Sequence, residues 1–461
     1  METFDVLVIG SGAGMHIAER ALMEGMTVAL VEMGPLGGTC LNRGCIPSKM
    51  VIYPMDVVQM IREAGKLGIN ARVDTIDFKF IMKRMRELIE KDRQYIEEGV
   101  EKTRNLRLFK GRGEFESDYT LRVSSGEVIK ADNIFIASGA RTLIPPIKGI
   151  ENIEYLTSEN IWSIEEPPRS ILIIGGGFVG VEFAHFFSTI GTRVTLISRS
   201  RRLLKNAEPE ISELLLRSMR RRMRIETGLE VIEVEKEGDL INFKAVDVSG
   251  GELRTFSTDS LLIASGRRPN SDILKVEKTG VETDERGFIV VDEYFRTSRE
   301  RIWAFGDAIG RAMFRHVANY EAGIVWNNFI EKNMLKMDYD KIPYAVYGYP
   351  QVASVGLTEK TAKDRGYNVL VGQYYYEDTA RGAAMAVEEG FVKVLVDGET
   401  GKLLGCHIVG PYAPEIIQEA ITVMNCGDGS YLPIVRSMHI HPCMSEVLQF
   451  AFGNLHSHRH S

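Results

Sequence analysis

The chain is poor in cysteine, in long apolar runs and in net positive charge, and each shortage excludes a class of protein. Five cysteines in 461 residues are too few, and odd in number, for a secreted fold held together by disulfides. No apolar stretch approaches the about 20 residues that a membrane span needs. The net charge of −7 makes nucleic acid and anionic membranes unexpected partners.

What is present is ordinary globular material. With 44% hydrophobic and 26% charged residues, the chain has room for about three domains. Its first residues enter a strand-like run, Phe4 to Ile9, without a basic segment or cleavage site, so we expect a cytoplasmic protein. In a reducing compartment, a close pair of cysteines is more typical of catalysis than of structural crosslinking.

Cys40 and Cys45 form such a pair. Residues five apart in an ideal α-helix lie roughly 8 to 9 Å apart, beyond the about 4.4 to 6.8 Å that separates the Cα atoms of a disulfide. A bridge therefore needs an irregular turn, which Gly44 permits, and Pro47 suits the first turn of a following helix. Zinc favours tighter spacing and a second ligand pair, neither of which is evident, so we predict no metal.

A glycine-rich turn precedes the cysteines. Gly10, Gly12 and Gly14 follow a predicted strand at 6–9 and open a helix, a pattern that brings backbone amides close to a pyrophosphate. Glu32 ends the next strand, 22 residues after Gly10, where a carboxylate can accept a ribose hydroxyl. Met15 stands at the third glycine position of the motif, which weakens the expected packing of helix on strand.

A second copy of this pattern, about 165 residues later, has all three glycines. Gly175, Gly177 and Gly180 follow the strand 171–174 and precede a helix and the strand 193–198. Two such turns in one chain indicate two bound dinucleotides. From about residue 342 the chain alternates strands and helices without another nucleotide motif, which indicates a third, α+β domain.

These elements together resemble the flavoprotein pyridine nucleotide-disulfide oxidoreductases over essentially the whole chain. The segments that carry the resemblance are 38–49 with both cysteines, the second glycine turn, Gly306-Asp307, and 439–446. Within the family, segments 1–5, 183–185 and 315–319 look most similar to mycothione reductase. The predicted fold class is therefore α/β, with two Rossmann-like dinucleotide-binding domains and a C-terminal α+β dimerisation domain. We place the FAD-binding domain at 1–149 and 266–336, the NAD(P)-binding domain at 150–265, and the interface domain at 337–461.

The resemblance also implies a role for each site residue. Cys45 would face the flavin and Cys40 the substrate, Lys49 would lie by the flavin paired with Glu182, and His441 with Glu446 would form the acid–base pair. His439 is the alternative histidine. In relatives the histidine comes from the partner subunit, so a homodimer is expected. The implied FAD contacts are Gly10, Gly12, Gly14, Glu32, Thr39, Lys49, Gly113 and Asp307. The implied nicotinamide contacts are Gly175, Gly177, Gly180, Arg199, Lys205 and Gly266.

The end of the second strand bears on which nicotinamide cofactor is used. An acidic residue there favours NAD, whereas a 2′-phosphate favours arginine or lysine. Ser198 occupies that position and is followed by Arg199 and Lys205, so we predict NADPH, with NADH as the alternative. The competing interpretation is a solvated basic loop.

The substrate is predicted only as a class. The basic loop favours a reductase of a small disulfide such as mycothione over a dihydrolipoamide dehydrogenase acting with NAD, possibly within a dehydrogenase complex. A flavin-bearing redox sensor with little turnover is the alternative of another class. Cys443, two residues after His441, is read as a small buried thiol, with a regulatory cysteine as the competing hypothesis.

Overall fold

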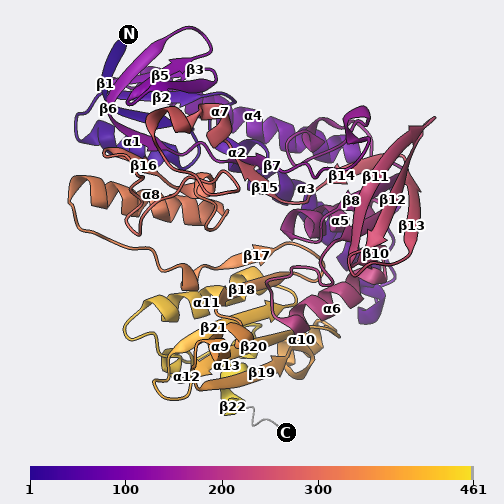
Figure 1. The fold of residues 1–461 in the computed structure, drawn as a ribbon. Coiled ribbons are helices and arrows are strands. Elements are labelled where there is room, and N and C mark those ends of the chain that lie inside the picture. Colours follow the sequence, from indigo (N-terminus) through magenta and orange to yellow (C-terminus); the bar gives the residue numbers. More distant parts are fainter. Residues whose placement is uncertain (458–461) are drawn as a thin grey trace.

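The computed structural model describes residues 1–457 and arranges them as three bodies (Figure 1). The first body is built on a seven-stranded sheet, with strand order β3-β2-β1-β6-β5-β4 and with β16 beside β6. The strands β3, β2, β1, β6 and β16 run parallel, so their carboxyl ends meet at one edge, where ligands bind in such sheets. The elements are β1 (Glu2–Ile9), α1 (Gly14–Met23), β2 (Val28–Glu32), β3 (Leu106–Lys110), β4 (Gly113–Ser117), β5 (Thr120–Val123), β6 (Val128–Ile136), β16 (Ile302–Ala304) and α8 (Arg315–Ile330).

The second body repeats the parallel arrangement on a smaller scale. Its four-stranded sheet has the order β10-β9-β8-β14, and a three-stranded antiparallel sheet, β11-β12-β13, lies beside it. The elements are β8 (Ser170–Ile174), α5 (Phe178–Ile190), β9 (Arg193–Ser198), α6 (Pro209–Arg220), β10 (Arg224–Thr227), β11 (Leu229–Glu237), β12 (Leu240–Asp247), β13 (Leu253–Thr258) and β14 (Ser260–Ile263). The chain passes between the two bodies twice. The two connecting segments, β7 (Ala140–Thr142) and β15 (Arg267–Pro269), pair with each other as antiparallel strands.

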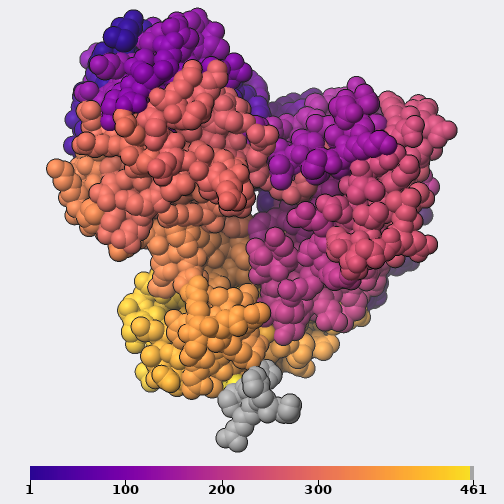
Figure 2. Space-filling view, in the orientation of Figure 1, coloured from indigo at the N-terminus to yellow at the C-terminus, as the bar shows by residue number. Residues whose placement is uncertain are grey.

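The third body is an antiparallel sheet of order β17-β18-β21-β20-β19-β22 with helices packed on it. Its elements are β17 (Tyr344–Val346), β18 (Val352–Gly356), α9 (Glu359–Asp364), β19 (Val369–Tyr375), β20 (Phe391–Asp397), β21 (Leu403–Val409), α11 (Ala413–Asn425), α12 (Leu432–Arg436), α13 (Glu446–Gly453) and β22 (His456–Ser457). Figure 2 shows the three bodies in space-filling form, with a hollow between the first and the second. The α/β class with two Rossmann-like units and an α+β region is confirmed, and the domain boundaries stay predictions.

One helical segment ties the first body to the second. The helix α3 (Cys45–Glu63) and the long helix α4 (Phe78–Lys102) share a hydrophobic core with α5. In that core Ile52 and Met55 of α3 and Phe183 and Phe187 of α5 are almost fully buried. The start of α3, where one cysteine lies, is thus fixed by burial against the second body. Within residues 1–457, no helix combines the length and apolar character that crossing a membrane requires.

Candidate active site

The two cysteines lie on successive helices with a sharp break between them. Cys40 belongs to α2 (Gly38–Asn42), and Cys45 is the first residue of α3. Gly44 makes the break possible, because a Cβ there would lie 3.1 Å from the carbonyl oxygen of Thr39 and 3.3 Å from the Cα of Cys40. The irregular turn expected from the spacing is therefore present, and both residues are free thiols in the structure.

The surroundings of the two thiols make them chemically unequal. The hydrogen bond between Cys40 and Cys45 raises the pKa of Cys40 and lowers that of Cys45 to about 7. The ammonium group of Lys49, one helical turn further along α3, lowers the pKa of Cys45 further, and the helix N-terminus favours the same charge. Near neutral pH, Cys45 is therefore the thiolate of the pair and Cys40 holds the proton.

Lys49 is held in place from two other parts of the chain. Its Nζ lies 2.7 and 2.8 Å from the carboxylate oxygens of Glu182 on α5, and the Glu182 residue is buried. The backbone amide of Tyr347, just after β17, donates to the same carboxylate at 3.0 Å, and its ring lies 4.7 Å from Nζ. All three bodies therefore meet at this ion pair. Tyr347 belongs to no motif, so sequence reasoning missed it.

A second contact keeps α3 and α5 in register. The buried ring of His185 on α5 bonds through Nε2 to Asp56 on α3 at 2.9 Å, and its Nδ1 lies 3.0 Å from the guanidinium of Arg222. Because guanidinium groups only donate, Nδ1 accepts and Nε2 carries the proton. Burial lowers the pKa of His185, so the ring is neutral. This contact and the pair of Lys49 with Glu182 hold α3 against α5 at two points along their length.

The first glycine turn is organised around Glu32 at the end of β2. Its carboxylate accepts from the amide and hydroxyl of Ser11 at 2.8 and 2.7 Å, and from the amide of Gly34 at 2.8 Å. Ser11 is itself fully buried. The carboxylate is thus placed at the carboxyl edge of the sheet, where the sequence predicted it.

Two glycines of that turn are required by close packing. A Cβ on Gly10, which has a φ of +102°, would lie 2.4 Å from the carbonyl oxygen of Ala137 at the end of β6. A Cβ on Gly14 would lie 2.8 Å from the side chain of Val8. The sequence predicted that Met15 would weaken the packing of helix on strand. Gly14, one residue earlier, provides the close approach instead.

Asp307 lies at the same sheet edge, directly after β16. Its side chain is partly buried, which raises its pKa, and the Nε of Arg267 lies 3.4 Å from its carboxylate. The preceding residue, Gly306, donates its amide to Glu321 on α8 at 2.7 Å, and the hydroxyl of Tyr339 donates to Glu321 as well. Burial raises the pKa of Glu321 to about 7. Glu321 thus holds the turn that carries Asp307, a role with no sequence signature.

The other predicted residues of the first site lie in different surroundings. A Cβ on Gly12 would lie 3.5 Å from a terminal nitrogen of Arg315 and 3.8 Å from the Cα of Gly38, so it would touch these groups without clashing. The hydroxyl oxygen of Ser138, next to the turn, is buried without a hydrogen-bond partner. Thr39 is exposed beside Cys40. Gly113 begins β4, where a Cβ would meet Leu121 at 2.7 Å, so packing alone explains that glycine.

In the second glycine turn, two glycines are required by close packing and a third faces open space. A Cβ on Gly175 would lie 2.2 Å from the carbonyl oxygen of Ala264, and one on Gly180 would lie 1.9 Å from that of Gly175. Gly177, at the start of α5, has nothing within 4 Å of its Cβ position. The open face and the helix N-terminus suit the phosphate groups of a second dinucleotide.

The loop after β9 presents the predicted basic residues to solvent. Ser198 is buried at the end of the strand, and Arg199 is exposed with a loose contact of 3.6 Å to Glu230. The ammonium group of Lys205 has no ion-pair partner among residues 1–457. Gly266 follows β14 with a φ of +130° and accepts from the amide of Leu143. Both cations are thus accessible to a ligand at this loop, and only Arg199 has an ion-pair contact there among residues 1–457.

His441 and Glu446 form a hydrogen-bonded pair in the third body. The Nδ1 of His441 lies 2.8 Å from Glu446, whose other oxygen accepts from the amide of Cys443 at 2.9 Å. Burial opposes ionisation of Glu446, but these hydrogen bonds hold its pKa below the ordinary value. The side chain of His441 is 71% exposed and its Nε2 has no hydrogen-bond partner among residues 1–457, whereas His439 is almost buried against Glu419 at 3.0 Å. The geometry therefore favours His441.

One chain does not bring this pair to the thiols. Figure 1 places α2 and α3 in the upper half of the molecule, and α12 and α13, which flank His441, at the lower end. Of the residues expected to act together, the cysteines and Lys49 meet Glu182, and His441 meets Glu446, but the two groups stay apart.

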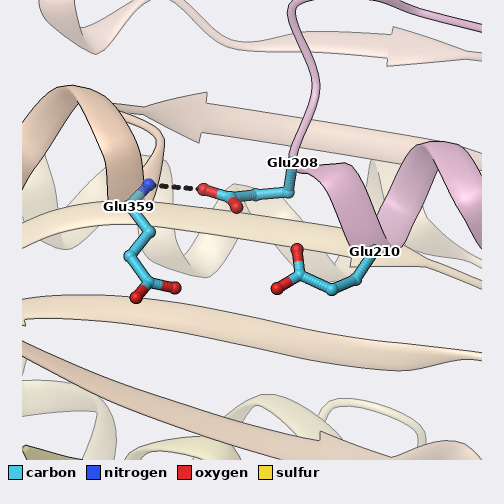
Figure 3. Close-up of side chains that lie close together, drawn as sticks. All are labelled: Glu208, Glu210 and Glu359. Carbon is cyan, nitrogen blue, oxygen red and sulfur yellow. Dashed lines mark hydrogen bonds between the residues drawn. The ribbon is translucent and has the colours of Figure 1, made fainter. Parts of the chain in front are cut away.

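A group of carboxylates elsewhere has the geometry of a metal site. Figure 3 shows Glu208, Glu210 and Glu359 around a common space between α6 and α9. That space already has a cation, because the buried Nζ of Lys393 lies 3.0, 3.0 and 2.7 Å from the three carboxylates. The hydrogen bonds and charges of these groups outweigh the effect of burial and raise the pKa of Lys393. The cluster is a buried ion-pair network.

Comparisons with known proteins place this geometry in context. The sequence profile described as "Pyridine nucleotide-disulphide oxidoreductase" matches residues 4–322, and that of the same family's dimerisation domain matches residues 342–452. Mycothione reductase of Mycobacterium tuberculosis is 34% identical over 99% of this chain and 100% of its own length. Dihydrolipoyl dehydrogenase 2, mitochondrial, of Arabidopsis thaliana is 34% identical, covering 97% and 89%. The solved structure of the Cu(II) complex of the HOCl-induced flavoprotein disulfide reductase RclA from Escherichia coli is 28% identical, with a TM-score of 0.88 and coverage of 98% and 99%.

Proposed function

Because the chain belongs to the pyridine nucleotide-disulphide oxidoreductase family, we propose that it reduces a small disulfide of the mycothione class with electrons from NADPH. The family consists of oxidoreductases that act on sulfur groups and use FAD and NAD(P)H. The observation that carries the proposal is the inequality of the two thiols, with the pKa of Cys45 lowered to about 7 beside Lys49 and that of Cys40 raised.

The two glycine turns, the open position at Gly177 and the unpartnered Ser138 hydroxyl suit the two dinucleotides. When bound, FAD supplies the transfer of an electron pair from the nicotinamide to the disulfide. Reduction of a bond between Cys40 and Cys45 gives a thiolate at Cys45, which Lys49 stabilises, and a thiol at Cys40. Loss of the Cys40 proton to a base then makes it the nucleophile toward substrate.

The exchange that follows needs no further oxidant. The Cys40 sulfur attacks one sulfur of the substrate disulfide and releases the first thiolate. This thiolate takes the proton that the base accepted from Cys40. The Cys45 thiolate then attacks the Cys40 sulfur, restores the internal disulfide and releases the second thiolate, which solvent protonates. The two electrons of NADPH thus leave as two substrate thiols.

We assign the base to His441 of a second copy of the chain. Support comes from its exposed Nε2, from the bond to Glu446 that fixes the ring, and from the distance between this pair and the thiols within one chain. The C-terminal match to a dimerisation domain supports a homodimer. Because this transfer of electrons needs thiols that can be kept reduced, we place the protein in the cytoplasm.

The choice of NADPH rests on Ser198, Arg199 and Lys205. A guanidinium and an ammonium near the end of β9 suit a 2′-phosphate, and no carboxylate stands at the strand end to repel it. The second candidate function is oxidation of a dihydrolipoyl group with NAD, which the 34% identity to dihydrolipoyl dehydrogenase favours.

An anaerobic titration followed by a substrate panel tests the proposal. NADPH should produce a long-wavelength absorption band from the Cys45 thiolate against the flavin, and a mycothione-type disulfide should reoxidise the protein faster than lipoamide or glutathione disulfide. The kcat/KM for NADPH should exceed that for NADH. A tenfold preference for NADH with lipoamide as the best substrate would establish the second candidate instead.

A further inference from the structure

Arg315 is a half-buried cation without a protein partner. It is the first residue of α8, and among residues 1–457 its guanidinium has no hydrogen bond and no ion pair. Arg222, another partly buried arginine, does have partners, because its guanidinium bonds to His185 and to the carbonyl of Tyr349. Withdrawing a charge from water without a counter-charge is unfavourable, so a ligand that supplies one would be bound favourably.

The position of Arg315 points to the first dinucleotide site. One of its terminal nitrogens lies 3.5 Å from the place that a Cβ on Gly12 would take, so the guanidinium lies against the glycine turn. The pKa of Cys40 is raised chiefly by its hydrogen bond with Cys45, and the charge of Arg315 acts against that rise. The guanidinium therefore lies beside the middle of the turn and close enough to Cys40 for its charge to act on that thiol.

No carboxylate of the site is available to neutralise it. Glu32 is occupied by Ser11 and Gly34, and Asp307 faces Arg267. The anion that Arg315 meets must therefore come from the ligand.

We propose that Arg315 binds the pyrophosphate of the FAD held at the first glycine turn, opposite the backbone amides of that turn. The proposal rests on the assignment of this turn to FAD. The pyrophosphate is the part of the cofactor that is anionic at neutral pH, and the planar fork of a guanidinium can grip phosphate oxygens with two hydrogen bonds. The motif residues supply amides and the N-terminus of α1 but no side-chain cation, so Arg315 adds the missing charge.

The test compares cofactor retention in three variants of the full-length flavoprotein. The variants are Arg315→Gln, Arg315→Lys, and the control Arg104→Gln, which changes an exposed arginine in the loop after α4. FAD release is followed by the rise in flavin fluorescence, and FAD affinity by rebinding to the stripped protein. Arg315→Gln should weaken FAD binding by at least about tenfold, the loss expected for a charge-assisted hydrogen bond. Arg315→Lys should lose less, and Arg104→Gln nothing.

ADP distinguishes the pyrophosphate from other targets, because it carries two linked phosphates but no flavin. Its affinity for the stripped protein should fall in Arg315→Gln as strongly as that of FAD. Weakened FAD binding with unchanged ADP binding would mean that Arg315 contacts the flavin ring, and would overturn the proposal. Unchanged binding of both ligands, with a shifted pH profile of Cys40 alkylation, would overturn it in favour of a counter-ion for the thiol.

The failure of this proposal can be told from failure of the proposed function. If the wild-type protein binds FAD and reduces disulfides while Arg315→Gln retains FAD equally well, only the role of Arg315 is wrong. If the wild-type protein binds no FAD, both are wrong. If Arg315→Gln regains its disulfide reductase activity at saturating FAD, the role in cofactor binding is supported apart from the chemistry.

Discussion

At the scale of single residues, the site depends on charges placed beside one sulfur. Lys49 lowers the pKa of Cys45 and Glu182 raises it, although the two side chains are paired with each other. The pair therefore sets the pH at which the thiolate forms, and its members act in opposite directions.

The reactivity of Cys45 should follow these charges. In the reduced protein, the alkylation rate of Cys45 should rise with pH around a midpoint near 7. Lys49→Met should move that midpoint up by about one pH unit, because a nearby positive charge favours the thiolate, and Glu182→Gln should move it down. Lys102→Met, in an exposed pair on α4, is the control and should leave it unchanged. A midpoint that moves in the same direction in both site variants would contradict the assignment.

The two histidines of the C-terminal segment offer a matched comparison. His441→Gln should lower kcat for disulfide reduction by about 10² to 10⁴, the range for loss of a general acid–base. His439→Gln should leave kcat nearly unchanged, since that ring is tied to Glu419. Reduction of the bound flavin by NADPH should be normal in both variants. An equal loss of kcat in the two would remove the distinction drawn from their geometry.

At the scale of elements, each glycine turn combines positions that need close packing with one that leaves space. Gly180 approaches the backbone of Gly175, whereas Gly177 faces an open region at the start of α5. The same residue type thus serves stability at one position and ligand access at another.

Alanine at each position should separate the two roles. Gly180→Ala would place a Cβ 1.9 Å from a carbonyl oxygen, so α5 must shift, and we expect about 1 to 3 kcal/mol of destabilisation in urea unfolding. Gly177→Ala should unfold close to the wild-type protein but raise the KM for NADPH. A stability loss at Gly177 with none at Gly180 would be the opposite of what the packing predicts.

Local patterns predicted the elements well, and contacts between distant elements explain what was missed. The strand and glycine signals of β1, α1, β8 and α5 depend on neighbouring residues, and so does the contact of His441 with Glu446, five residues apart. Tyr347, Glu321 and Arg315 have no such signal. Each is important only because the folded chain brings it beside a residue 15 to 303 positions away. The sharp break before Cys45 was expected, and the resemblance implied the pair of Lys49 with Glu182, but the hydrophobic core that α3 and α5 share was not expected.

At the scale of the whole molecule, buried charges join the second body to the third. Lys393 on β20 lies between Glu208 and Glu210 at the start of α6 and Glu359 on α9. Lys393→Met should destabilise the protein by about 3 to 5 kcal/mol, because it leaves the buried carboxylate of Glu208 without its ammonium partner. Lys360→Met, in an exposed pair on α9, is the control and should cost less than about 1 kcal/mol. Equal thermal unfolding of the two variants would show that the cluster adds no stability.

The proposed division of the active site between two chains can be tested with hybrids. Cys40→Ser and His441→Gln chains should each be inactive, but each retains the half that the other lacks. After equal mixing and subunit exchange, about half of the dimers are hybrids with one complete site of two, so about a quarter of the wild-type activity should return. No recovery after proven exchange would mean that His441 acts on the cysteines of its own chain.

The separation of α2 and α3 from α12 and α13 along one chain has a consequence for dilute enzyme. If every working site is assembled from two chains, as proposed, a lone chain has no partial activity. When most chains are monomeric, the fraction of chains in dimers grows in proportion to the total protein concentration. The turnover per chain therefore grows in the same proportion. The rate of the whole solution then follows the square of protein concentration, and the abundance of the protein becomes a control on its own specific activity.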